Sequence, residues 1–121
     1  MVYEIGNKGL QEVNLNIPQH SSLSFAIVHV DDSTGNVIDH SNDTANMAFE
    51  SKDDEPHEIF VDLDDCVDCG AESILVSIPP SVSGSLPVGQ LNWDLFIDMG
   101  EERLRLCYGK VRIYDSYALD R

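Results

Sequence analysis

Two cysteines three positions apart, Cys66 and Cys69, are the first residues of this sequence whose types and spacing suggest chemistry. A zinc site needs four ligands, and a second pair at similar spacing usually supplies the other two. Here the only other thiol is Cys107, and no histidine lies at ligand spacing from it. A redox dithiol would need a helix N-terminus to lower its pKa, whereas the neighbouring carboxylates raise it. We therefore expect two small residues in a surface loop, with a labile disulfide as the open alternative.

Acidic residues gather on both sides of this pair and form the best metal candidate of the chain. Calcium binds several carboxylate and carbonyl oxygens that converge from a flexible loop. The spacing does not match an EF-hand, because no glycine follows three alternating acids and no glutamate closes the loop. We interpret the run as a solvated acidic loop and keep calcium as the weaker alternative, with four candidate ligands: Asp62, Asp64, Asp65 and Asp68. No other metal or cofactor is predicted.

The sequence contains no pattern for catalysis. It lacks the nucleophile motif GxSxG, the zinc motif HExxH and a glycine-rich phosphate loop. The four histidines lie in different segments, and His29 falls within a predicted strand, where packing is the simpler role. Carboxylate pairs are abundant, but abundance without a pocket does not indicate acid–base catalysis. We expect that the protein is not an enzyme.

Length and charge narrow the classes of function. A chain of 121 residues, 42% of them hydrophobic, suffices for one domain with its own core. The net charge of −15 argues against nucleic acid as a partner, because no basic surface is available to neutralise phosphates. It disfavours anionic membranes for the same reason, and no apolar run approaches membrane-spanning length. The lack of a signal-peptide pattern and the odd number of cysteines predict synthesis in a reducing cytoplasm.

Alternation of apolar and polar residues is the dominant pattern, and it is clearest between Leu91 and Ser116. A period of two, bounded by glycine and acidic turn residues, is typical of antiparallel strands with one buried face. Gly109 is expected to break the second half of this stretch into two strands. The residues expected to hold the core here are Trp93, Leu95, Leu104, Leu106 and Val111.

Further strands are predicted upstream, at 11–17, 22–30, 44–51, 58–63 and 73–78. The segment 44–51 also contains good helix formers, and its short length favours a strand. The segment 64–71 is expected to be a loop, and the proline-rich segment 79–87 a rigid, non-helical connection. Residues 1–9 are expected to be a loose arm before a single domain at 10–121. The predicted fold is an all-β, immunoglobulin-like antiparallel β-sandwich of about seven or eight strands.

A series of short motifs runs through most of the chain. An apolar strand at 23–28 is followed by a D-x-x-G-x-x-I-D turn at 32–39 and by the segment TANMAF at 44–49. Later come ILVSIP, LPVGQ, LNWDL and LRLCYGKV. This series resembles the N-terminal domains of phage baseplate upper proteins and related tail and virion modules, although the loop at 62–70 departs from their pattern. The resemblance implies a structural role in assembly and carries over no catalytic residues.

The leading hypothesis is a non-enzymatic structural protein of a phage particle, in its tail, its baseplate or as a virion accessory module. It would be made in the host bacterial cytoplasm, work in the virion, and dock on other virion proteins and on copies of itself. The alternation predicts outward side chains for four interface candidates: Arg103, Arg105, Lys110 and Arg112. The open alternative for these cations is that they only offset carboxylates such as Glu101 and Glu102.

A second class of function is a calcium-dependent or carbohydrate-binding β-sandwich used for adhesion. In that case Trp93 and either Tyr114 or Tyr117 would stack on a sugar ring. The alternation places Trp93 with Leu91 and Leu95, which favours the core for its side chain.

Overall fold

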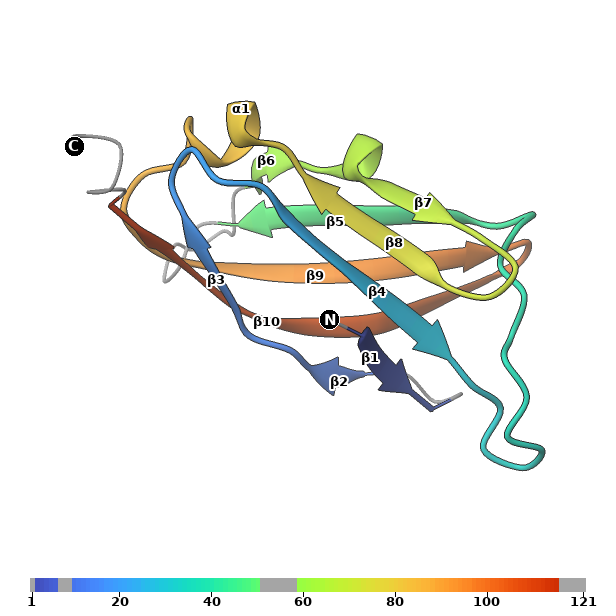
Figure 1. The fold of residues 1–121 in the computed structure, drawn as a ribbon. Coiled ribbons are helices and arrows are strands. Elements are labelled where there is room, and N and C mark those ends of the chain that lie inside the picture. Colours follow the sequence, from blue (N-terminus) through green and yellow to red (C-terminus); the bar gives the residue numbers. More distant parts are fainter. Residues whose placement is uncertain (1, 7–9, 51–58, 116–121) are drawn as a thin grey trace.

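The computed structural model describes residues 2–6, 10–50 and 59–115 and shows a sandwich of ten strands in that part of the chain (Figure 1). One short 3-10 helix, η1 (Asp64–Cys66), and one turn of α-helix, α1 (Pro80–Ser83), join the strands. The strands are β1 (Val2–Ile5), β2 (Gln11–Glu12), β3 (Leu15–Pro18), β4 (Leu23–His29), β5 (Thr44–Glu50), β6 (Ile59–Asp62), β7 (Val67–Cys69), β8 (Ile74–Ile78), β9 (Gly89–Met99) and β10 (Glu102–Tyr114).

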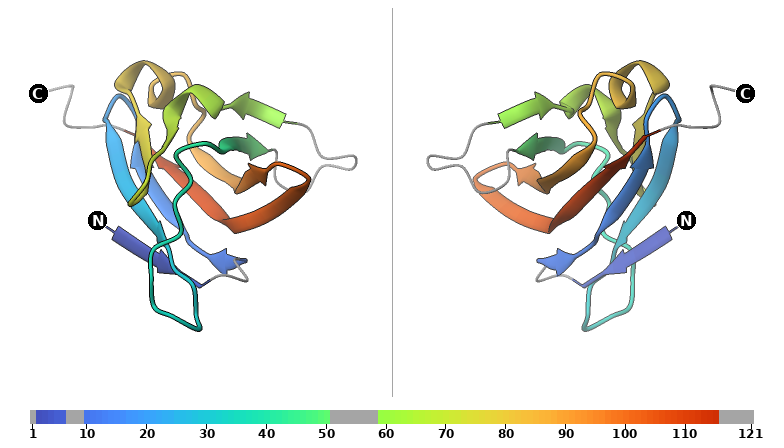
Figure 2. Two further views of the ribbon diagram at one scale, coloured as in Figure 1. Left: turned by 90° about the vertical axis from the view of Figure 1, so that its right-hand side faces the viewer. Right: turned by 90° about the vertical axis from the view of Figure 1, so that its left-hand side faces the viewer.

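The strands form two layers, which Figure 2 shows edge-on. A four-stranded sheet has the order β1-β4-β8-β7, and a six-stranded sheet has the order β2-β10-β9-β5-β6, with β3 also paired to β10. The predicted all-β sandwich is therefore confirmed. Both sheets are mixed rather than purely antiparallel, because β1 runs parallel to β4, and β2 and β3 run parallel to β10.

The N-terminal segment supplies all three parallel pairings. Residues 2–5, which the sequence placed in a loose arm, form the edge strand β1. The physical reason is that Tyr3 and Ile5 share one side of an extended chain: Ile5 is fully buried, and the ring of Tyr3 meets that of Phe25 at 5.6 Å between centroids. The predicted strand at 11–17 is divided into β2 and β3.

Two predicted connections contain regular structure. The segment 64–71, expected to be a loop, holds η1 and β7, and Val67 of β7 pairs with Val76 of β8. The segment 79–87, expected to be non-helical, holds α1, because Pro80 stands at the first helical position, where a missing N–H costs nothing. Both elements are four residues or shorter, which is too short for a periodic pattern to reveal them.

Strand β10 is continuous over 13 residues, and Gly109 does not break it. Arg105 pairs with Phe96 and Cys107 pairs with Leu95 of β9, so Leu106 is an extra residue, a β-bulge. Leu106 and Cys107 are both buried, and beyond the bulge the odd-numbered residues face the core. The change of parity along this stretch is therefore due to the bulge rather than to an interruption of the strand.

The core lies between the sheets around Trp93, whose side chain is buried. Its Nε1 donates a hydrogen bond of 2.7 Å to the carbonyl oxygen of Val13, and the N–H of Val13 donates to the oxygen of Tyr108 at 2.8 Å. Gly109 stands directly opposite Trp93 in the β9–β10 ladder, and a Cβ atom there would lie 2.1 Å from the Val13 oxygen. Only glycine lets the segment before β3 pass this close to β10. Of the five predicted core residues, four are buried, and Leu104 is partly buried against them.

Gly109→Ala should lower the free energy of unfolding by about 3 kcal/mol, because the new methyl group collides with a backbone atom that is held on both sides. The matched control is Gly35→Ala, where φ is +75° but no atom lies within 4 Å of the new Cβ. That change should cost about 1 kcal/mol through backbone strain alone. Urea unfolding monitored by tryptophan fluorescence measures both values, and equal losses would contradict the close approach.

Stability at alkaline pH should depend on Cys107. Burial raises the pKa of its thiol to about 12 from 9.0, with Asp94 adding to the shift. Because the folded pKa is raised, the stabilisation is complete below pH 9 and is lost as the pH rises towards 12. Over this window the unfolding free energy of the wild type should fall by about 1.4 kcal/mol per pH unit more than that of Cys107→Ala. Parallel pH profiles of the two proteins would contradict the burial of the thiol.

Candidate functional site

The outer face of the six-stranded sheet carries the most distinctive side chains of the molecule. Every lysine and arginine in the described part of the chain lies on β10, and all four of these residues are exposed. They are the predicted interface candidates Arg103, Arg105, Lys110 and Arg112. Their outward direction agrees with the prediction, which divided this stretch into two alternating runs at Gly109. Their role in an interface stays a prediction.

The bulge at Leu106 places these four cations on one face. Arg103 and Arg105 have odd numbers and Lys110 and Arg112 even ones, so an unbroken alternation would send the two pairs to opposite faces. One inserted residue between them reverses the alternation and brings all four to the solvent side. The same shift leaves Arg105 and Tyr108 side by side.

Each arginine of β10 stacks on an aromatic ring. The guanidinium carbon of Arg103 lies 4.3 Å from the ring centre of Phe96, that of Arg105 lies 4.9 Å from Tyr108, and that of Arg112 lies 5.3 Å from Tyr114. A cation over an aromatic face at these distances is attracted by the quadrupole of the ring. We call this set the arginine–aromatic row: Phe96, Arg103, Arg105, Tyr108, Arg112 and Tyr114.

Two of the arginines also face carboxylates of β9. Arg103 Nε lies 3.4 Å from Asp98 Oδ1, and Arg105 Nη2 lies 3.6 Å from Asp94 Oδ2. Both contacts are long, and the arginine of each is exposed to solvent, so they add little stability. Burial raises the pKa of Asp94, and Arg105 and then Arg103 oppose that shift. Lys110 and Arg112 make no ion pair with any residue in the described ranges.

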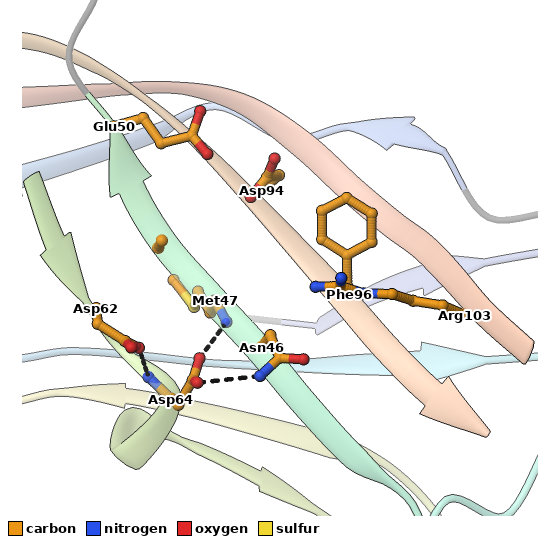
Figure 3. A pocket seen from close by; sticks show the side chains of 9 residues that line it. Asn46, Met47, Glu50, Asp62, Asp64, Asp94, Phe96 and Arg103 are labelled. Atoms are coloured by element: carbon orange, nitrogen blue, oxygen red, sulfur yellow. Dashed lines mark hydrogen bonds between the residues drawn. The ribbon is translucent and has the colours of Figure 1, made fainter. Parts of the chain in front are cut away.

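A depression of about 420 Å³ adjoins the row on the side of β5 and β6 (Figure 3). Four carboxylates, one arginine and the ring of Phe96 are among the groups that line it. The lining residues are Asn46, Met47, Ala48, Glu50, Asp62, Asp64, Asp94, Phe96 and Arg103.

Asp64 holds η1 against β5. Its Oδ1 accepts a hydrogen bond of 2.7 Å from the backbone N–H of Met47, and its Oδ2 accepts one of 3.0 Å from Asn46 Nδ2 (Figure 3). The N–H of Asp64 donates to Asp62 Oδ1 at 3.0 Å. This carboxylate therefore serves as a structural link between the strand and the helix.

The four calcium candidates do not gather at one point. Asp62 and Asp64 line the depression, whereas Asp65 and Asp68 lie exposed on η1 and β7. In residues 2–6, 10–50 and 59–115, no group of three or more His, Cys, Asp or Glu side chains could hold a metal ion. Calcium binding stays a prediction.

The two cysteines of the CxxC segment are free thiols on η1 and at the end of β7. Both are half-buried, so they are not part of the surface loop that the sequence suggested. Burial raises the pKa of both thiols, helped by Asp65 beside Cys66 and by Asp43 beside Cys69. A thiol that stays protonated at neutral pH is a poor nucleophile and a poor metal ligand.

The structure joins two histidines that the sequence leaves apart. The buried rings of His29 and His40 are parallel, with 5.1 Å between centroids, and His29 Nδ1 lies within hydrogen-bond distance of His40 Nε2, at 2.8 Å. His40 Nδ1 in turn contacts Asp43 Oδ2 at 2.8 Å. The bridge between Val30 and Val37 closes the turn after β4 and delivers His40 to β4. The contacts from His29 to His40 and from His40 to Asp43 hold this turn against the core. In the sequence, the signal for them is the run of turn-forming residues at 31–36, which reverses the direction of the chain.

The remaining sequence candidates lie as follows. Trp93 is in the core, so it offers no stacking surface to a sugar. Tyr114 is 40% exposed and sits under Arg112. Tyr117 and His57 fall outside the described residues. In the described part of the chain, no helix is long and apolar enough to cross a membrane.

Comparison with solved structures shows a likeness of overall shape. No protein-family model matches the chain, and no curated protein matches it. Among solved structures, it is similar to the N-terminal domain of phage TP901-1 ORF48, with a TM-score of 0.48 and 9% sequence identity. The match covers 93% of this chain and 96% of that one. A likeness of this size says nothing about site residues or partners.

Asp64→Asn should lower the unfolding free energy by about 2 kcal/mol, because a neutral amide weakens the bond to Met47 and cannot accept from Asn46 at its second atom. Asp65→Asn is the matched control: it removes the same charge at the exposed neighbouring position and should change little. Thermal unfolding of the two variants measures the difference. Equal losses would contradict the structural role of Asp64.

Proposed function

We propose that the protein is a non-enzymatic structural module of a bacteriophage particle, in its tail, its baseplate or as a virion accessory component, and that it works by docking on other proteins. The observation that carries the docking role is the arginine–aromatic row. A protein of net charge −15 presents all the lysines and arginines of its described part on the outer side of one strand. Such concentration makes this strand unlike the other described strands.

The composition of the row is that of a docking surface. Arginine and aromatic residues are enriched where protein interfaces derive most of their binding energy. The three stacks and the hydrogen bond of 3.1 Å from the Tyr114 hydroxyl to Asn16 Oδ1 restrain these side chains before a partner arrives. Side chains that are already ordered lose less entropy on binding.

Charge defines the kind of partner. Four cations on an acidic molecule favour an acidic protein surface, since opposite potentials steer the encounter and fix the orientation. Nucleic acid fits poorly, because Asp94 and Asp98 lie within the same face and the molecule as a whole repels phosphates. The acidic depression beside the row gives a basic side chain of the partner a place to enter.

The assignment to a phage particle is supported by the motif series. The D-x-x-G-x-x-I-D turn and the later LPVGQ and LNWDL segments resemble those of phage tail and virion modules. The turn chemistry occupies the connection after β4, and LNWDL forms the first half of β9. Synthesis in the host cytoplasm and work in the virion follow from this assignment.

Neutralising the row should remove the protein from particles. In particles purified from the producing bacterium, wild-type chain quantified by mass spectrometry should be present. Arg105→Gln with Arg112→Gln should reduce its amount by about tenfold or more, because two stacked arginines leave the surface.

The control is Asn36→Asp with Ser81→Glu, which changes the net charge equally at two exposed positions outside both sheets. It should leave incorporation unchanged. Equal incorporation of the arginine variant, with its melting curve intact, would contradict docking through the row. Wild-type chain missing from the particles would contradict the virion assignment.

A further inference from the structure

On the outer face, the paired residues of β9 and β10 carry groups of opposite chemical character. Along the β9–β10 ladder, Arg103 stands opposite Asp98, Arg105 opposite Phe96, and Tyr108 opposite Asp94. On β10 these positions hold cations or a hydroxyl donor, and on β9 they hold carboxylates or an aromatic face. Each of these three residue pairs therefore combines a cation or hydroxyl donor on β10 with a carboxylate or aromatic ring on β9 that could bind it.

This arrangement makes the face complementary to itself. Consider a two-fold axis that lies above the outer face, parallel to the strands and midway between β9 and β10. It places β10 of one copy over β9 of the other, with residues that are paired in the β9–β10 ladder facing each other across the interface. Arg103 then meets Asp98 of the second copy, and Arg105 meets Phe96 of the second copy. We propose that the partner of the arginine–aromatic row is the same face of a second copy of this chain, an inference that rests on the proposed docking function and names its partner.

The groups of the row have capacity for a second partner. A guanidinium has five N–H donors, and Arg103 and Arg105 each approach one carboxylate at 3.4 and 3.6 Å. Their side chains remain 56% and 42% exposed. Burial raises the pKa of Asp94, so a further cation near it stabilises its charged form. A second copy would complete these half-made ion pairs.

The strand beside the ladder leaves room for this contact. On β5, the outward residues at the heights of Asp98, Phe96 and Asp94 are Thr44, Asn46 and Ala48. These three residues are small and uncharged, so they bring no like charges against the second copy. The charged residue of this strand, Glu50, lies further along it, opposite Asn92.

The net charge of −15 makes the association depend on salt. At low ionic strength the two acidic molecules repel each other over long distances. Near 0.15 M salt the Debye length is about 8 Å, which screens distant charges more than contacts at 3–4 Å. Association should be strongest at intermediate salt and weaker at both extremes.

Complementary charge reversal tests the proposal. One variant carries Arg103→Glu and Arg105→Glu, and the other carries Asp94→Lys and Asp98→Lys. In sedimentation equilibrium the wild type should reach twice the monomer mass of 13.4 kDa, and each variant alone should stay monomeric. An equimolar mixture should recover the doubled mass, because the glutamates on β10 of one variant then face the lysines on β9 of the other. The lysine variant is its own control, since it lowers the net negative charge and would associate more readily if global repulsion decided the outcome.

Melting curves establish that both variants are folded. If the double changes unfold the chain, the single variants Arg103→Glu and Asp98→Lys are used in their place, each alone and then mixed. A monomeric wild type, a folded mixture that stays monomeric, or variants that remain dimeric on their own would each overturn the self-pairing. If the wild type is monomeric while the Arg105→Gln, Arg112→Gln variant is lost from particles, the docking function stands with a different partner. If that variant is also incorporated normally, both proposals fail.

Discussion

The indole of Trp93 donates a hydrogen bond to the Val13 carbonyl above Gly109, and the six-stranded sheet depends on this contact. It joins β9 to the segment between β2 and β3, which runs beside β10. An unsatisfied indole N–H in the core would cost about 1–3 kcal/mol, so the register that places Trp93 opposite Gly109 is strongly preferred. That register decides which residues of the hairpin face solvent.

The bulge at Leu106 determines which side chains of β10 lie on the outer face. Before it, Arg103 and Arg105 point outward, and after it the alternation is reversed, so Lys110 and Arg112 point outward as well. One extra residue therefore converts two basic pairs into a single stripe, and it buries Leu106 and Cys107 side by side. The same bulge thus shapes both the fold and the candidate site, and β-bulges are often found beside functional sites.

Local pattern reveals much of this fold and less of the site. Strands β8 and β9 follow from alternation, because each has one buried face. The segment of β4 is apolar on both faces, and the short length of the segment of β5 favours a strand over a helix. The parallel pairing of β1 with β4 could not be read in that way, since it depends on a partner more than 20 residues away. The outward direction of the four cations was predicted because the sequence was divided into two alternating runs at Gly109, whereas the structure reverses the alternation by the bulge at Leu106. Their aromatic and acidic neighbours on β9 were not predicted, because they depend on the bulge and on cross-strand register. The His29–His40 contact likewise needs the fold to bring a strand and a turn together.

If the outer face of the six-stranded sheet docks on other proteins, a neighbouring molecule must cover it in the assembled particle. A side-chain-resolution map of that particle tests this. Protein should cover β9 and β10, with Arg103, Arg105 and Arg112 in contact with carboxylates or aromatic rings of the neighbouring molecule. A map in which this face is open to solvent and the contacts lie on the four-stranded sheet would contradict it.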